Sequence, residues 1–189
     1  MNNDKWEPVS AGDHQIIVKQ LDRKPRGVIG IAVRCSYGFP QVIANRPMST
    51  QMEDVKVFPT LFWLTCPYLR RRVASLESEG WIGRFQAMTG EDESFLHQLE
   101  TEHETYAAMR AGLVPDDVLR SFHEKYPNRH KVLTSSGVGG IRNRDGVKCL
   151  HCHVADHLGR GYNVIGAKVL DMLNNITCCS SGDCGRERE

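Results

Sequence analysis

The strongest constraint on the fold is a change of apolar pattern at Pro67. Before it, apolar residues come in short β-branched or aromatic runs, at 28–33, 41–44 and 60–65. After it, they recur at helical spacing, at 67–80, 81–88, 92–111, 115–125, 148–158 and 163–175. Strands followed by helices are typical of an α+β fold. We therefore predict a small antiparallel sheet of about three strands near the N-terminus, packed by a C-terminal set of helices.

The connections between these segments give the expected domain organisation. Asp13 is in position to cap a short helix that ends near Leu21, and residues 36–40 are expected to turn the first two strands into a hairpin. Residues 45–57 and 135–140 are expected to be loops. We predict a flexible N-terminus at 1–12, a single α+β domain at 13–176 and a flexible tail at 177–189 that contains cysteines.

Charge and hydropathy narrow the class of protein. Lys and Arg number 24 against 23 Asp and Glu, so there is no strong nucleic-acid signal. No apolar run reaches the roughly 20 residues that span a bilayer, and the first fifteen residues lack the apolar stretch of a secretory signal. We expect a cytoplasmic protein without a membrane segment. In that compartment, its seven cysteines are better interpreted as thiols, ligands or core residues than as disulfides.

The residues with the most chemistry lie between Cys149 and His157. In a helix, one face would carry Cys149, Cys152, His153, Asp156 and His157, whereas His151 would share the apolar face. Thiolates and imidazoles at three- and four-residue spacing favour a metal site, with zinc as the leading candidate. A rise of about 1.5 Å per residue separates the two ends of the segment by about 12 Å, so a tetrahedral site needs ligands from elsewhere.

Other segments offer such ligands. Cys66 precedes Pro67 at a strand-to-helix junction, where a helix N-terminus can lower the pKa of a thiol. His103 on the long helix is a candidate ligand or general base, and Cys35 is a further candidate. The tail adds Cys178, Cys179 and Cys184. The structural alternative is that the cysteines are buried core residues and the histidines are solvated or hydrogen-bonded.

The same segment also contains Cys-x-x-Cys-His, the attachment sequence of c-type haem, at 149–153. Covalent haem attachment is expected outside the cytoplasm, and the chain shows no export signal. A haem protein is therefore not favoured.

Several short motifs together resemble an uncharacterised bacterial family, domain of unknown function 501. They cover residues 13–170 and are, in order, Pro25-Arg26-Gly27, Arg34-Cys35 followed by Gly38 and Pro40, Phe58-Pro59-Thr60, Leu64-Thr65-Cys66-Pro67, His103-Glu104 with Tyr106, Val138-Gly139-Gly140 and Lys148-Cys149-Leu150-His151. The resemblance implies that Lys-Cys-Leu-His is the distinctive stretch, whereas the following Cys152 and His153 are not a fixed part. It implies no activity.

Two hypotheses of function follow. The first is a metal or thiol-centred site built around Cys149 with His151 or His153, and completed by Cys35, Cys66 or His103; zinc-assisted hydrolysis or thiol chemistry would fit these groups. The alternative is a non-enzymatic binding module that docks a protein or RNA partner. The sequence leaves open whether the protein is an enzyme, and it names no substrate.

Overall fold

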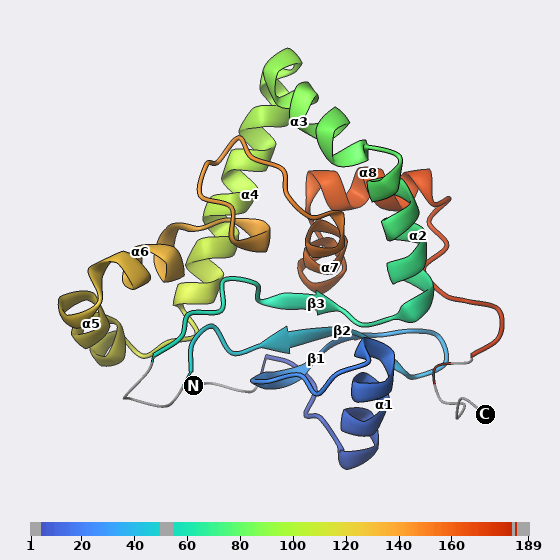
Figure 1. Cartoon of the computed structure of the whole chain (residues 1–189), viewed down its shortest axis with the longest axis horizontal. Helices are drawn as coiled ribbons and strands as arrows, with labels where there is room; N and C mark the ends of the chain where they lie inside the picture. Colours follow the sequence, from blue (N-terminus) through green and yellow to red (C-terminus); the bar gives the residue numbers. More distant parts are fainter. Residues whose placement is uncertain (1–4, 50–54, 183, 185–189) are drawn as a thin grey trace.

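The computed structural model describes residues 5–49, 55–182 and 184. Three antiparallel strands, β1 (Val28–Arg34), β2 (Pro40–Asn45) and β3 (Phe62–Leu64), form one sheet in the order β1-β2-β3 (Figure 1). Helices account for most of the described chain after β3. The predicted α+β fold, with a small antiparallel sheet near the N-terminus and helices after it, is confirmed.

The central strand β2 is buried along its whole length. It lies between β1 and β3, with Ile43 paired to Ile31 on one side and to Trp63 on the other. Helix α1 (Ala11–Leu21) packs below the sheet and α7 (Leu150–Arg160) packs above it (Figure 1). Cover from both sides explains why residues 42–44 in the middle of this strand are all apolar, without alternation.

Helix α1 begins one turn earlier than predicted. Its cap is Ser10, whose hydroxyl accepts the backbone N–H of Asp13 at 3.1 Å, while the Asp13 carboxylate accepts the backbone N–H of Ser10 at 3.1 Å. Asp13 is therefore the inner acid of a capping box and not the cap itself. The Asp13 carboxylate and that of Glu7 also accept hydrogen bonds from Arg34, which ties this helix to β1.

The remaining helices follow β3. They are α2 (Pro67–Ser78), α3 (Trp81–Glu91), α4 (Glu93–Ala111), α5 (Asp116–Lys125), α6 (Pro127–Ser135), α7 and α8 (Val164–Met172), with a 3-10 turn, η1, at Val138–Gly140. Most of them are joined by short connections, and a longer one separates α6 from α7. Helix α6 was not predicted, because it buries only Leu133 and so has little apolar periodicity. The 3-10 turn lies within the predicted loop 135–140.

Helix α7 lies in the middle of the helical layer. Leu150, Val154 and Ala155 are fully buried in the main core, and α7 contacts β3, α2 and α8. Helix α8 comes especially close, because a Cβ at Gly166 would lie only 2.4 Å from the carbonyl oxygen of His153. A side chain at position 166 would therefore force the two helices apart. This packing fixes where the ends of α7 can lie.

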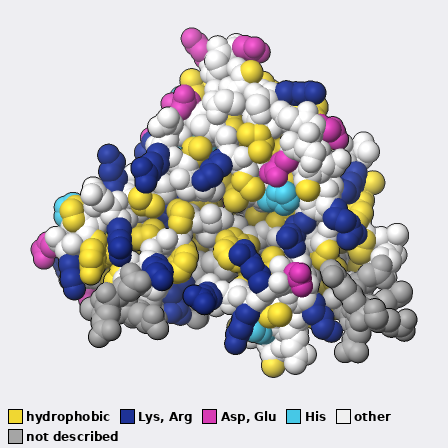
Figure 2. All heavy atoms as spheres, in the orientation of Figure 1, with side chains coloured by type: hydrophobic (Ala, Val, Ile, Leu, Met, Phe, Trp, Pro, Cys, Tyr) yellow, Lys and Arg dark blue, Asp and Glu magenta, His cyan; other side chains and the backbone are white. Residues whose placement is uncertain are grey.

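The distribution of charged and hydrophobic side chains on the surface does not point to a particular kind of partner. On the face drawn in Figure 2, Lys and Arg side chains are interspersed with hydrophobic ones and do not form a continuous positive patch. Among the helices of the described residues, none combines the length and apolar character needed to cross a bilayer.

Candidate thiol and metal site at the start of helix α7

Cys149 is the residue that caps the N-terminus of α7. Its backbone is extended, with φ −127° and ψ 117°, so it lies just outside the helix that the sequence pattern placed it in. Its carbonyl oxygen accepts the backbone N–H groups of Cys152 at 3.1 Å and His153 at 3.3 Å, which closes the first turn. Its sulfur is therefore held at the positive end of the helix dipole, a position that favours a thiolate.

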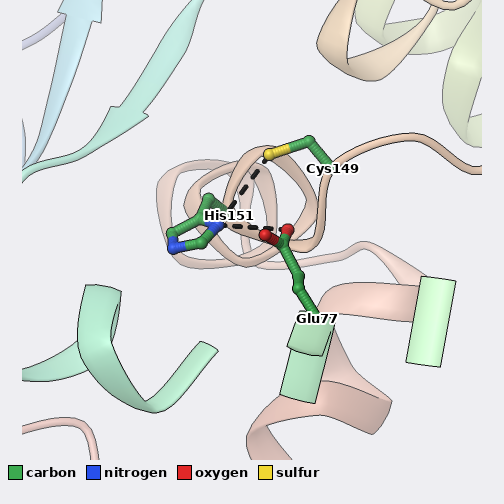
Figure 3. A group of neighbouring side chains, drawn as sticks. All are labelled: Glu77, Cys149 and His151. Atoms are coloured by element: carbon green, nitrogen blue, oxygen red, sulfur yellow. Dashed lines mark hydrogen bonds and ion pairs between the residues drawn. The ribbon is translucent and has the colours of Figure 1, made fainter. Parts of the chain in front are cut away.

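His151 lies two residues further on, and its ring faces the same sulfur. Its Nδ1 is 3.9 Å from the Cys149 sulfur and 3.1 Å from Oε1 of Glu77 (Figure 3). Its Nε2 donates to the backbone carbonyl of Arg70 at 3.0 Å. Because a carbonyl and a carboxylate only accept hydrogen bonds, these contacts favour a ring that carries a proton on both nitrogens.

Glu77 reaches the site from α2. Its Oε1 also accepts the backbone N–H of Leu150 at 2.7 Å, so this carboxylate caps α7 from outside, where Cys149 makes no side-chain cap. The side chains of Glu77 and His151 are 24% and 25% exposed, and Cys149 is also partly exposed. The group is thus rigidly held and still open to solvent.

The charges in this group stabilise one another. Interaction with the Cys152 thiol, followed by that with His151, lowers the pKa of Cys149 against the opposing effect of burial. Burial lowers the pKa of His151, but the Cys149 thiolate and the Glu77 carboxylate outweigh it and raise that pKa to about 9. The side-chain interaction with Cys149, together with burial, raises the pKa of Cys152. These shifts favour a thiolate at Cys149 beside a protonated His151 ring.

The same three side chains have the geometry of a metal site. One ligand atom each from Glu77, Cys149 and His151 lies within 4.8 Å of the other two. Across the described ranges, no other set of three His, Cys, Asp or Glu residues is this compact. The Nε2 hydrogen bond to the Arg70 carbonyl would orient the ring for a metal on Nδ1, as outer partners of metal-bound histidines do.

Two histidines predicted as ligands lie deeper, in the core. His153 hydrogen-bonds through Nδ1 to the side-chain oxygen of Asn163 at 3.1 Å. His103 accepts the backbone N–H of Val138 through Nδ1 and donates through Nε2 to the carbonyl of Gly146, both at 3.1 Å. Their ring centroids are 5.9 Å apart, and burial lowers the pKa of both. His103 and His153 therefore lie next to each other, but neither belongs to the compact group of Glu77, Cys149 and His151.

Asp156 and His157 also occupy positions apart from Cys149. Asp156 is fully buried and pairs with Arg160, and it accepts a hydrogen bond from Asn163 at 2.9 Å. His157 is partly buried further along the same helix. Asp156 therefore belongs to a buried polar network that joins α7 to α8.

The remaining predicted cysteines lie at the start of α2, in the turn after β1 and in the C-terminal tail. Cys66 is 3% exposed, and burial raises the pKa of its thiol, so the helix N-terminus does not produce a thiolate there. The sulfur of Cys178 accepts the backbone N–H of Ser36 at 3.1 Å, which places the start of the tail beside the turn that carries Cys35. None of the three belongs to the compact group around Cys149.

Glu77 was missed by sequence reasoning. One weak indication was available: Glu77 lies near the C-terminal end of a helix, where the helix dipole disfavours an anion unless a cation is near. The Arg70 contact could not be found at all, because it uses a backbone carbonyl and not a side chain.

Comparison with known proteins gives one result. Neither the curated proteins nor the solved structures provide a match to this chain. A family model described as "Protein of unknown function (DUF501)" matches residues 31–171, about three quarters of the chain, and includes Glu77, Cys149 and His151. The chain therefore belongs to the DUF501 family.

Proposed function

We propose that the chain is a thiol-dependent protein in which Cys149 is the nucleophile. The observation that carries this proposal is the contact of the Cys149 sulfur with a His151 ring whose two nitrogens both face hydrogen-bond acceptors. Such a ring is held as an imidazolium, which in turn keeps the sulfur deprotonated. This is the arrangement of an activated nucleophile with an oriented partner.

Each member of the group has a separate role in this proposal. The Cys149 thiolate attacks an electrophilic atom of the substrate, and His151 supplies a proton to the leaving group. Glu77 and the Arg70 carbonyl hold the ring in one orientation. All seven cysteines are free, a state that a reducing compartment such as the cytoplasm would maintain.

The test is the pH profile of alkylation at Cys149, measured by iodoacetamide labelling of the folded protein and peptide mass spectrometry. We expect the rate at Cys149 to stay nearly constant from about pH 8 down to about pH 5, because a thiolate with a strongly lowered pKa does not take up a proton in this range. Cys66 is the matched internal control, since its buried thiol should label slowly throughout.

Two results would contradict the proposal. A Cys149 rate that falls tenfold with each pH unit, as for an ordinary thiol, would show that no stabilised thiolate exists. Labelling of Cys149 that requires denaturant would show that the sulfur cannot be reached. Either result would leave a non-enzymatic module that docks a protein or RNA partner as the better hypothesis.

The compact ligand group favours one second candidate, a zinc site. Cys149, His151 and Glu77 would hold the ion with a thiolate, an imidazole and a carboxylate, and three protein ligands leave one position for water or substrate. Protein purified without chelator would then contain one zinc ion per chain. That zinc would be lost in Cys149→Ala and Glu77→Ala but kept in His157→Ala, which lies further along α7. Zinc in all three variants, or in none, would exclude this site.

A further inference from the structure

The first turn of α7 contains a second thiol that the proposed nucleophile does not require. Cys152 follows Cys149 by three residues, and its backbone N–H donates to the Cys149 carbonyl at 3.1 Å. Each thiol also shifts the pKa of the other, downward at Cys149 and upward at Cys152. A backbone hydrogen bond from residue i+3 to residue i closes a turn whose end Cα atoms lie less than about 7 Å apart, which overlaps the roughly 4.4–6.8 Å between Cα atoms that a disulfide bridges.

The two sulfurs have different surroundings. Cys149 lies at the helix end beside His151, whereas Cys152 packs against the core and against the turn η1. A Cβ at Gly139, which has φ +66°, would lie 3.7 Å from the Cys152 sulfur, so the backbone of this turn covers it closely. Cys149 is thus accessible to a substrate, whereas Cys152 is shielded by the core and lies next to Cys149.

We propose that Cys149 and Cys152 form a dithiol–disulfide couple and that the substrates of the site are disulfides and the thiols they yield. This inference rests on the proposed nucleophilic role of Cys149 and names its substrate class. A second thiol in contact with the nucleophile is what the resolution of a mixed disulfide requires. A nucleophile that acts on a carbonyl has no use for it.

The reaction balances with the groups present. The Cys149 thiolate attacks one sulfur of the substrate disulfide, forms a mixed disulfide and releases a thiolate, which takes a proton from His151. Cys152 then attacks the Cys149 sulfur, and its proton goes to the second departing thiolate. Two electrons pass to the substrate, which becomes two thiols, while Cys149 and Cys152 become one disulfide. With a dithiol substrate, the same steps run in reverse.

The test uses the full-length protein, treated with a chelator and equilibrated with mixtures of reduced and oxidised glutathione. Acid quenching and peptide mass spectrometry would then identify the linked cysteines. We expect a Cys149–Cys152 disulfide in the wild type and glutathione trapped on Cys149 in Cys152→Ser. Cys149→Ser should show neither product, and Cys66→Ser, as the matched control, should behave like the wild type.

Three outcomes would overturn the inference. The first is stable glutathionylation of Cys149 in the wild type without the link to Cys152. The second is a link from Cys149 to another cysteine. The third is oxidation of Cys149 by hydrogen peroxide in a parallel sample, with no reaction toward oxidised glutathione. In each case rapid alkylation of Cys149 would still support the proposed nucleophile, whereas an unreactive Cys149 would remove both proposals.

Discussion

Helix α7 carries two polar regions that differ in what their charges can do. At its start, Cys149 and His151 meet Glu77 in a group that is about one quarter exposed. In its second half, Asp156 and Arg160 form an ion pair whose side chains are 0% and 3% exposed. Both regions contain a cation beside an anion, but only the first can reach a substrate.

The difference shows that a dense set of titratable side chains does not by itself mark a reactive site. In the buried region, Asn163 hydrogen-bonds to both Asp156 and His153 and so joins α7 to α8, while Nε2 of His153 has no hydrogen-bond partner among the described residues. At the helix start, Cys149 is partly exposed to solvent. We interpret the first region as chemical and the second as structural, and the predictions below test that division.

The largest expected effect is on stability, from Asp156→Ala. Removal of this carboxylate leaves the Arg160 guanidinium buried without an anion, which should lower the free energy of unfolding by about 3–5 kcal/mol. Urea denaturation measures this change. Asp171→Ala is the control, because it removes only an exposed hydrogen bond to Asn175 and should change stability by no more than about 0.5 kcal/mol. A loss as small as the control's would show that the buried pair is not structural.

The next effect is the pH dependence of stability. Burial lowers the pKa of His103 to about 4 and that of His153 to about 3, below the unfolded value of 6.5. Above pH 6.5 both rings are neutral in both states. Below it, the unfolded chain takes up protons that the folded chain does not, so stability should fall by about 1.4 kcal/mol per pH unit for each histidine.

Urea denaturation at about pH 7, 6 and 5 would measure this slope, and His153→Gln should remove about half of it. His151 should act in the opposite sense. Its pKa is raised to about 9, so its contribution to stability is complete below 6.5 and is lost as the pH rises through about 9. If His151→Gln changed the slope below pH 6.5 as His153→Gln does, the two regions would not differ as proposed.

A smaller effect is expected on the chemistry of Cys149 in His151→Gln. Loss of one neighbouring positive charge should raise the pKa of Cys149 by about one to two units, because opposite charges at this distance shift a pKa by about that amount. The Cys149 pKa is read from the pH at which the rate of iodoacetamide labelling falls by half. The control variant His157→Gln, which changes a residue further along the same helix, should leave that midpoint unchanged. An equal shift in both variants would show that the effect on Cys149 is not specific to its contact with His151.

The smallest effect is expected from Glu77→Gln. The amide oxygen can still accept the backbone N–H of Leu150, so stability should change by about 1 kcal/mol or less. Loss of the negative charge should lower the pKa of His151, which nuclear magnetic resonance titration of the ring measures directly. An unchanged His151 pKa would show that the Cys149 thiolate alone holds the imidazolium.

Much of the fold could be predicted from the sequence, because local patterns determine it. The apolar runs at β1 and β2 and the proline at the start of α2 all gave elements close to those observed. Helix α6 escaped notice because a single buried leucine carries no periodicity. Asp13 was placed one turn wrong, because Ser10 and Asp13 are both good capping residues and only the backbone geometry separates them.

The candidate site could be predicted only in part. Cys149 stands out on residue type, and the family resemblance pointed to His151. The helical-face argument favoured His153 instead, because it treated Cys149 as helical, whereas its backbone is extended. Glu77 comes from a helix more than seventy residues earlier in the chain, and contacts over such a separation depend on tertiary packing that no local pattern records.

The double use of Glu77 has a consequence for the backbone. The same carboxylate oxygen accepts the amide of Leu150 and faces the His151 ring, so any cation or oxidation event that draws Glu77 away also uncaps α7. Amide hydrogen exchange at Leu150 would then speed up whenever the sulfur changes state. The order of the first turn of α7 would then depend, through Glu77 of α2, on whether Cys149 is reduced, oxidised or bound to a ligand.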